Sequence, residues 1–256
     1  MAKEKPLLSI QNVKKVFKTR DGELEALGDV SFDVHPGEFV SIVGPSGCGK
    51  TTILKIVAGL LAKSAGVIHV DEKQFDPTRD VGFVFQAASL LPWRSVLDNV
   101  LLPIEILRMD KAAMKTKAAE LLGLVGLRDF EDSYPNELSG GMQQRVSIAR
   151  ALIHDPKLLL MDEPFGALDA ITRERMNLEL LRIWRESKKT IIFVTHDINE
   201  ALFLSDRVIV LSARPSQMVL ALDIHLPRPR TLEVRALPEF GNYFLQIYNS
   251  LELREP

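Results

Sequence analysis

The chain of 256 residues is 46% hydrophobic and 26% charged with a formal net charge of −2, which excludes a disordered or fibrous protein and gives no sign of nucleic-acid binding. Its single cysteine, Cys48, excludes an intramolecular disulfide and favours a reducing compartment. The polar start MAKEKP and the lack of any run of about 18 apolar residues predict neither a secretory signal nor a membrane span, so we expect a cytoplasmic domain.

The first third of the chain predicts a small antiparallel sheet. Residues Leu7–Phe17 and Asp29–Val34 alternate loosely between apolar and polar, and the turn signal Asp21-Gly22 lies between them. Further along, five short runs predict strands: Phe39–Val43, Val81–Phe85, Leu158–Met161, Ile191–Thr195 and Val208–Leu211. Four of these five runs are almost wholly apolar, which is typical of strands covered on both faces. The fold class is therefore α/β, with a mainly parallel core sheet flanked by helices.

The sequence GPSGCGKT, Gly44 to Thr51, follows the first of these strands and precedes a helical run. It matches the phosphate-binding pattern G-x-x-x-x-G-K-[ST] in the strand–loop–helix context that this pattern requires. Glycines let several amide N–H groups point inward, and the helix adds the positive end of its dipole. Lys50 would supply a cation for phosphates, and the Thr51 hydroxyl an oxygen ligand for Mg²⁺. The alternative, in which the glycines only form a tight turn, leaves this context unexplained.

Between about residues 88 and 155 the strands give way to helices, which predicts an inserted helical subdomain. Its runs Ala112–Leu127 and Met142–Ile153 are the clearest helices. The second follows LSGGMQQR (138–145), where Ser139 is a candidate N-cap and two glycines would admit an anion. Taken without context, ordinary capping, with Gly used for the turn, is the preferred explanation of this helix start. If it binds an anion, either it grips the same nucleotide as the phosphate loop, or it serves a nucleotide held by another copy of the chain.

Two carboxylates end the apolar run LLLMDEP (158–164). Asp162 and Glu163 are poorly explained by packing, because burying an unpaired carboxylate costs several kcal/mol. Asp162 would hold Mg²⁺ through water, and Glu163 would orient and deprotonate an attacking water. The alternative is an acidic loop that caps the next helix, Ala170–Glu186.

His196 directly follows the strand IIFVT, on the sheet edge where the acidic pair is expected. We interpret the four other histidines as structural: His35, His69, His154 and His225. Residues 220–256 are expected to form a short C-terminal extension, in which LPRPR (226–230) leads to the helix Phe240–Leu251.

The order GPSGCGKT, Gln86, LSGGMQQR, LLLMDEP, ALD (167–169) and His196 resembles the ATP-binding-cassette (ABC) ATPases, from about Leu8 to Leu211. The resemblance implies a P-loop NTPase of ABC type, one domain over 1–256, that hydrolyses ATP with Mg²⁺. It implies catalytic roles for Glu163, His196, Gln86 and Lys50, and metal ligands at Thr51, Gln86 and Asp162. It implies nucleotide contacts at Phe17, Gly44, Pro45, Ser46, Gly47, Cys48, Gly49, Lys50, Thr51, Thr52, Ser139, Gly140, Gly141 and Gln143.

Individual roles also follow from the resemblance. Phe17 would stack on adenine, although alone it reads as a core residue, and Cys48 would contribute its backbone rather than its thiol. Residues Ser139–Gly141 would press on the γ-phosphate of ATP bound to a second copy of the chain, with Asp169 at the same dimer interface. His196 would contact the γ-phosphate.

A closer resemblance is to importer ATPases of the nitrate, taurine and alkanesulfonate group. The similar segments are FQAASLLPWRSVLDNV (85–100), EPFGALDAITR (163–173), FVTHDINEALFLSDRVIVLSARP (193–215) and LPRPR. The resemblance implies transmembrane permease subunits that dock near Gln86–Val96, where Trp93 belongs to an apolar cluster; the alternative for Trp93 is an ordinary buried loop. It also implies a solute-binding protein, no nucleic-acid partner, and a place on the inner face of the cell membrane.

Three other functions stay open at this point. The chain could power an exporter or a lipid-trafficking complex. It could be a soluble ATP-dependent regulatory or nucleic-acid module without a membrane partner, against which the absence of a basic tract argues. It could also be an inactive subunit, against which the presence of Lys50, Asp162, Glu163 and His196 argues.

Overall fold

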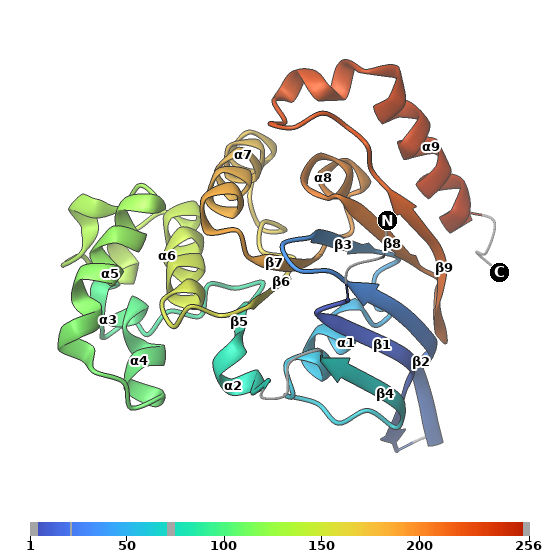
Figure 1. Cartoon of the computed structure of the whole chain (residues 1–256), viewed down its shortest axis with the longest axis horizontal. Coiled ribbons are helices and arrows are strands. Elements are labelled where there is room, and N and C mark those ends of the chain that lie inside the picture. The colour runs from blue at the N-terminus through green and yellow to red at the C-terminus, as the bar shows by residue number, and fades with distance from the viewer. Residues whose placement is uncertain (1–4, 21, 71–74, 253–256) are drawn as a thin grey trace. The chain divides into compact units, whose positions relative to one another are not determined.

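The structure is a computed structural model that describes residues 5–20, 22–70 and 75–252 (Figure 1). It divides into two compact units, residues 1–78 with 190–256 and residues 79–189. Parts of three predicted features lie outside the described residues: the first four residues of the polar start, Asp21 of the predicted turn, and the last four residues of the C-terminal extension. Within the described part of the chain, every helix is too short or too polar to cross a membrane.

An antiparallel sheet opens the first unit, as the alternating pattern predicts. Strand β1 (Leu8–Thr19) pairs antiparallel with β2 (Gly22–Val34) and, on its other side, with β4 (Ala65–Val70). Strand β9 (Ser216–Asp223) then joins β2 in parallel. Strands β4 and β9 were not predicted. Side chains of β4 alternate between exposed and half-buried, so this strand lacks the apolar run by which the core strands were found.

The core of the first unit is a set of buried parallel strands. Strand β3 (Phe39–Val43) lies between β7 (Thr190–Val194) and β8 (Arg207–Leu211), parallel to both, and β9 pairs antiparallel with β8. All five residues of β3 and of β7 are buried, which confirms the prediction drawn from their apolar runs. Four helical elements complete this unit: α1 (Lys50–Val57), α8 (Ile198–Leu204), η3 (Leu232–Ala236) and α9 (Pro238–Glu252).

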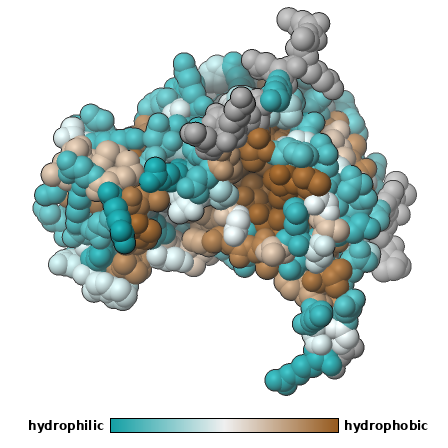
Figure 2. Space-filling model, turned by 60° about the horizontal axis from the view of Figure 1, so that its bottom comes forward, coloured by the Kyte–Doolittle hydropathy of each residue, from teal (hydrophilic) through white to brown (hydrophobic). Residues whose placement is uncertain are grey.

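These helices lie on both faces of the strands. Helices α8 and α9 lie on one face and α1 on the other (Figure 1). An apolar cluster joins α8, β8 and α9 through fully buried Leu202, Val210 and Ile247. On the other side, a hollow of about 640 Å³ next to α1 and β4 is lined by Ile56, Leu61, Ile68 and Phe75 among others, and apolar side chains gather on this face of the molecule (Figure 2). This mainly apolar lining does not suit a polyphosphate.

The second unit carries two parallel strands, β5 (Val81–Val84) and β6 (Leu158–Asp162). The chain between them is helical, as the sequence predicts, and α2 (Pro77–Asp80) precedes them. The elements that follow β5 are α3 (Val96–Val100), α4 (Leu102–Ile106), α5 (Lys111–Leu124), η1 (Arg128–Phe130), η2 (Pro135–Glu137), α6 (Gly140–Leu152) and, after β6, α7 (Ala170–Ser187). Helix α5 ends three residues before its predicted end at Leu127, because Gly126 adopts φ +67° and Leu127 N donates to Leu122 O at 2.7 Å.

Candidate nucleotide site

The loop between β3 and α1, which carries the predicted phosphate-binding pattern, is tightly packed at two of its glycines. A Cβ added at Gly44 would lie 2.8 Å from the Leu211 carbonyl oxygen. Gly49, which caps α1, has φ +108°, and its added Cβ would lie 2.7 Å from Leu27 Cδ2. Backbone therefore approaches backbone at Gly44, and Gly49 has a conformation that other residues rarely adopt. Both glycines are required by the folded loop itself.

Lys50 lies across this loop. Its side chain is 5% exposed, and Nζ donates to the carbonyl oxygens of Gly44 at 2.8 Å and Pro45 at 3.1 Å. An ammonium held over the loop, together with the N-terminus of α1, fits a polyphosphate.

The other predicted nucleotide contacts of the loop differ in exposure: Ser46 and Gly47 are exposed, Pro45, Thr51 and Thr52 are half-buried, and Cys48 is buried. Burial raises the pKa of the Cys48 thiol above its ordinary value of 9.0, so this thiol stays protonated at neutral pH.

Arg214 contacts the exposed tip of the loop. Its Nε donates to the Gly47 carbonyl oxygen, and a Cβ at Gly47 would lie 2.6 Å from Arg214 Nη2. Arg214 was not among the predicted site residues. The available signal was its position just beyond β8, since β8 pairs with β3 and both strands end beside the loop. The contact fixes the direction of one loop carbonyl.

Two further predicted residues belong to the first unit. The half-buried ring of Phe17 on β1 has Lys15 Nζ 4.9 Å from its centroid, a cation–π contact. His196 is exposed and lies between β7 and the N-cap of α8. The N-cap, Asp197, accepts from Asn199 N at 2.8 Å. The geometry holds His196 at the strand end where the sequence predicts it.

In the second unit, the acidic pair and Gln86 come together. Asp162 ends β6 and is 8% exposed. Glu163 follows with φ +44°, and a Cβ placed at Gly166 would lie 3.6 Å from Glu163 Oε2 and 3.8 Å from Gln86 Nε2. The carboxylate and the amide therefore approach the same point. Asp169, not the acidic pair, caps α7 by accepting from Thr172 N at 3.0 Å, and this hydrogen bonding lowers the pKa of Asp169.

The glycine-rich start of α6 is open on its exposed side. Ser139 is the N-cap, and its Oγ accepts from Met142 N at 3.3 Å. A Cβ at Gly140 would meet nothing nearer than Leu168 Cδ2 at 4.0 Å. The side chain of Gln143 turns back toward the preceding turn, since its Nε2 donates to Pro135 O at 2.8 Å. Ser139 thus makes an ordinary cap and leaves the first turn of α6 accessible.

The loop after Gln86 is held by two polar side chains, the half-buried Arg150 and the buried Asn99. Arg150 donates to Ser89 O at 2.9 Å and to Ala88 O at 2.7 Å. The fully buried Asn99 accepts from Leu91 N at 2.7 Å and donates to three carbonyl oxygens of the loop, those of Leu91, Arg94 and Ser95. Trp93, at the tip, is 72% exposed, so the alternative of a buried loop is wrong for this residue. The sequence analysis missed both bracing residues, because a lone Asn or Arg inside a helix carries no local signal.

Comparison with known proteins agrees with this geometry. A family model described as ABC transporter matches residues 27–166. The chain is 46% identical to an uncharacterised ABC transporter ATP-binding protein of Methanocaldococcus jannaschii, over 96% of this chain and 91% of the relative. It is 45% identical to the aliphatic sulfonates import ATP-binding protein SsuB of Bacillus cereus, over 93% of this chain and 94% of the relative.

Solved structures show the same mixed α/β fold. A dimeric structure of MJ0796, a bacterial ABC transporter cassette, aligns with a TM-score of 0.73 and 36% identity over 85% of this chain and 99% of that chain. A post-hydrolysis state of the same cassette, bound to ADP and Pi, aligns with a TM-score of 0.71 and 33% identity over the same shares.

Proposed function

Because the chain belongs to the ABC transporter family and is an ATPase of that family, we propose that it powers a membrane importer for a small anion such as a sulfonate, nitrate or taurine. The observation that carries the ATPase is the cradle after β3, with Lys50 Nζ 2.8 Å from Gly44 O over a loop whose glycines cannot be replaced without a clash. The name of the Bacillus cereus relative supports the importer and the class of solute.

The residues of the cradle fit ATP and Mg²⁺. The amides of the loop, the ammonium of Lys50 and the dipole of α1 would attract the phosphates, while Phe17 offers a half-buried ring to adenine. The donors assigned to Mg²⁺ are the hydroxyl of Thr51, the amide oxygen of Gln86 and the carboxylate of Asp162, all hard oxygen ligands. When bound, ATP supplies the reactive γ-phosphate and Mg²⁺ neutralises its charge.

Glu163 is the general base in this proposal. Its carboxylate approaches the same point as the amide of Gln86, an arrangement suited to holding one water between an acceptor and a donor. Glu163 would accept the proton of that water, and His196 would donate a hydrogen bond to the γ-phosphate.

Two copies of the chain form the working unit. Ser139, Gly140 and Gly141 begin α6 with an accessible first turn, which suits the phosphates held by the cradle of a second copy. The solved cassette with the same fold is described as dimeric, which supports this arrangement. Gln143 would support the turn before α6 through its bond to Pro135 O, and Asp169 would lie at the same interface.

The loop over Gln86–Val96 is the proposed contact for the permease. Trp93 exposes a large aromatic surface on a loop whose backbone is braced by Asn99 and Arg150, a preorganised anchor of the kind that dominates protein interfaces. The chain would then sit on the inner face of the cell membrane, with a solute-binding protein as an indirect partner.

Replacing the proposed base tests the function. Glu163→Gln keeps the shape of the side chain but cannot accept a proton, so we expect ATP binding to persist while phosphate release falls at least about 100-fold. ATP-bound dimers should then accumulate and elute earlier on size exclusion than the wild-type chain.

The matched control is Glu120→Gln at an exposed position of α5, which should hydrolyse ATP like the wild-type chain. A Glu163→Gln chain with normal turnover, or one that binds ATP and stays monomeric, would contradict the proposal. The importer is tested separately by purifying the complex: a solute-binding protein that takes up a sulfonate supports import, whereas its absence from a complete, active complex favours an exporter.

A further inference from the structure

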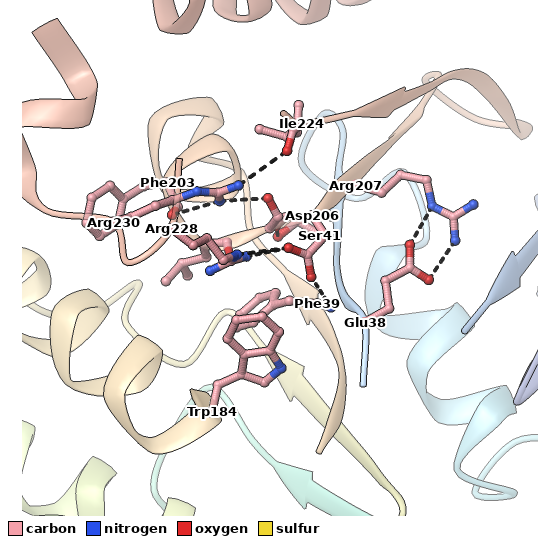
Figure 3. A network of polar contacts seen from close by, with 12 residues as sticks. Glu38, Phe39, Ser41, Trp184, Phe203, Asp206, Arg207, Ile224, Arg228 and Arg230 are labelled. Carbon is pink, nitrogen blue, oxygen red and sulfur yellow. Dashed lines mark hydrogen bonds and ion pairs between the residues drawn. The ribbon is translucent and has the colours of Figure 1, made fainter. Parts of the chain in front are cut away.

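The C-terminal segment after β9 places a buried arginine on the end of α8 (Figure 3). Arg230 is 5% exposed. Its Nη1 and Nη2 donate to four main-chain carbonyl oxygens: Leu202 at 3.1 Å, Phe203 at 3.1 Å, Ser205 at 2.7 Å and Ile224 at 3.4 Å. The last carbonyls of a helix have no partner inside the helix, so one guanidinium here satisfies several of them and joins them to the end of β9.

A second arginine extends this contact to the core strand. Arg228 Nη2 donates to Leu204 O at 2.8 Å, and its Nε donates to Asp206 Oδ1 at 2.9 Å. The other oxygen of Asp206 accepts from Phe39 N, the first residue of β3, at 3.0 Å. The end of α8 is therefore tied through Arg228 and Asp206 to the strand that leads to the phosphate loop.

Burying the charged guanidinium of Arg230 is energetically unfavourable. Burial, followed by the nearby charge of Arg228, lowers the pKa of Arg230 to about 10, so the guanidinium is still charged at neutral pH although its burial is unfavourable. An apolar side chain could fill the same space without that cost. What only a guanidinium supplies is a rigid set of donors that fixes the positions of several carbonyls at once.

The other end of α8 lies at the proposed site. Helix α8 has seven residues, so it is only about 10 Å long. His196 immediately precedes its N-cap, Asp197, and Thr195 Oγ1 donates to Glu200 Oε2 at 2.5 Å, which joins the end of β7 to the first turn of α8. A helix this short moves as one body, so a shift at its C-terminal carbonyls displaces its first turn and His196 with it.

We propose that Arg230, assisted by Arg228, is a positioning residue for ATP hydrolysis that holds α8 and thereby sets the place of His196. The inference rests on the proposed function, in which His196 contacts the γ-phosphate. In this proposal, the LPRPR segment of the C-terminal extension positions a residue for ATP hydrolysis.

The test compares three variants of the whole chain. Arg230→Gln should lower kcat between about 10- and 100-fold, because small displacements of catalytic groups cost that much, while KM for ATP changes less than about twofold. Arg230→Lys keeps the positive charge but lacks the planar set of guanidinium donors, so it should recover part of the lost kcat. Arg207→Gln is the matched control, because among the described residues the hydrogen bonds of Arg207 go to Glu38 and Asp33, and it should keep wild-type kcat.

A spectroscopic measurement separates positioning from general destabilisation. In a chain labelled at its five histidines, the imidazole signal of His196 should shift in Arg230→Gln and stay in place in Arg207→Gln, with His69 unchanged in both. Arg228→Gln should move the His196 signal in the same direction. This variant replaces Arg230→Gln in the test if Arg230→Gln does not fold.

An unmoved His196 signal, or equal loss of kcat in the Arg207 control, would overturn the inference. The premise is tested apart from it, since His196→Ala should abolish most turnover in an otherwise wild-type chain. A normal rate in that variant would overturn the role of His196 itself.

Discussion

At the scale of single residues, the buried Arg230 and the half-buried Arg150 act on main-chain carbonyls. Arg150 and Arg230 both have a lowered pKa because of burial, and both donate to carbonyl oxygens, Arg150 to the loop after β5 and Arg230 to the end of α8. Since both guanidinium groups remain charged at neutral pH, the segments they hold should not loosen over the physiological pH range.

His154 should make the stability of the second unit depend on pH. Burial, as the main cause, lowers the pKa of His154 below 6.5, and Lys117 acts in the same direction. The contact of Nε2 with Val81 O at 3.2 Å opposes this shift, as do Asp155 and Asp80. The unfolded chain then binds the proton more readily, so the stabilisation is present above pH 6.5 and is lost as the pH falls through the folded value. We expect the free energy of unfolding to drop between pH 7 and 5, by at most about 1.4 kcal/mol per pH unit.

Urea unfolding followed by tryptophan fluorescence measures this, because both tryptophans, Trp93 and Trp184, belong to the second unit. His154→Gln should flatten the pH dependence, whereas His69→Gln on β4 should leave it as in the wild type. An unchanged slope in His154→Gln would show that another group titrates.

At the scale of elements, the loop between β5 and α3 is braced by hydrogen bonds and an ion pair. Asn99 on α3 satisfies both the N–H and the C=O of Leu91, and Arg94 Nη1 pairs with Glu105 Oε2 at 2.7 Å. Lys111 Nζ reaches the other oxygen of Glu105 at 2.6 Å, and hydrogen bonds from Lys111 and then Arg94 lower the pKa of Glu105. These contacts present Trp93 in one place, so a partner loses little entropy in binding it.

Removing that side chain should weaken assembly with the permease. Trp93→Ala deletes an aromatic surface that is 72% exposed in the free chain, and an anchor of this type is worth about 2 kcal/mol or more, or at least about 30-fold in affinity. Co-purification of tagged permease subunits measures the loss. Leu245→Ala on α9, which removes a side chain that is 55% exposed, is the control and should assemble normally; equal assembly of both variants would place the permease elsewhere.

At the scale of the whole molecule, each ATP site is proposed to need two chains. Lys50→Ala damages the cradle, and Gly140→Asp places a carboxylate at the open start of α6 without steric conflict, since the nearest atom to its Cβ is 4.0 Å away. Each variant alone should be inactive. In a mixed dimer, however, the intact cradle of one chain meets the intact α6 of the other, so mixing should restore activity, up to roughly a quarter of the wild-type sites.

Phosphate release from the two variants, separately and mixed in equal amounts, measures this. A mixture that stays as inactive as its components would contradict a site built from two chains. Full activity of Gly140→Asp alone would show that the start of α6 takes no part in ATP hydrolysis.

The sequence by itself determined those features whose cause is local. Apolar runs identify the buried strands β3, β5, β6, β7 and β8 to within about one residue, because a strand covered on both faces must be apolar along its length. The phosphate loop is equally local, since the turn, the cation and the following helix are adjacent in the chain. The acidic pair and His196 could be named because each directly follows such a strand.

The tertiary structure decided which distant residues meet. Arg214 on the phosphate loop and Arg230 on the end of α8 join positions far apart in the chain, and no local motif predicts either contact. Gln86 and Glu163 could be named by resemblance, but only the fold brings their side chains toward one point. Strands β4 and β9 likewise depend on their partners β1 and β8 rather than on an apolar run. A hydrogen bond between distant segments forms only after the strands and helices have packed, so its members carry no pattern that a local reading can detect.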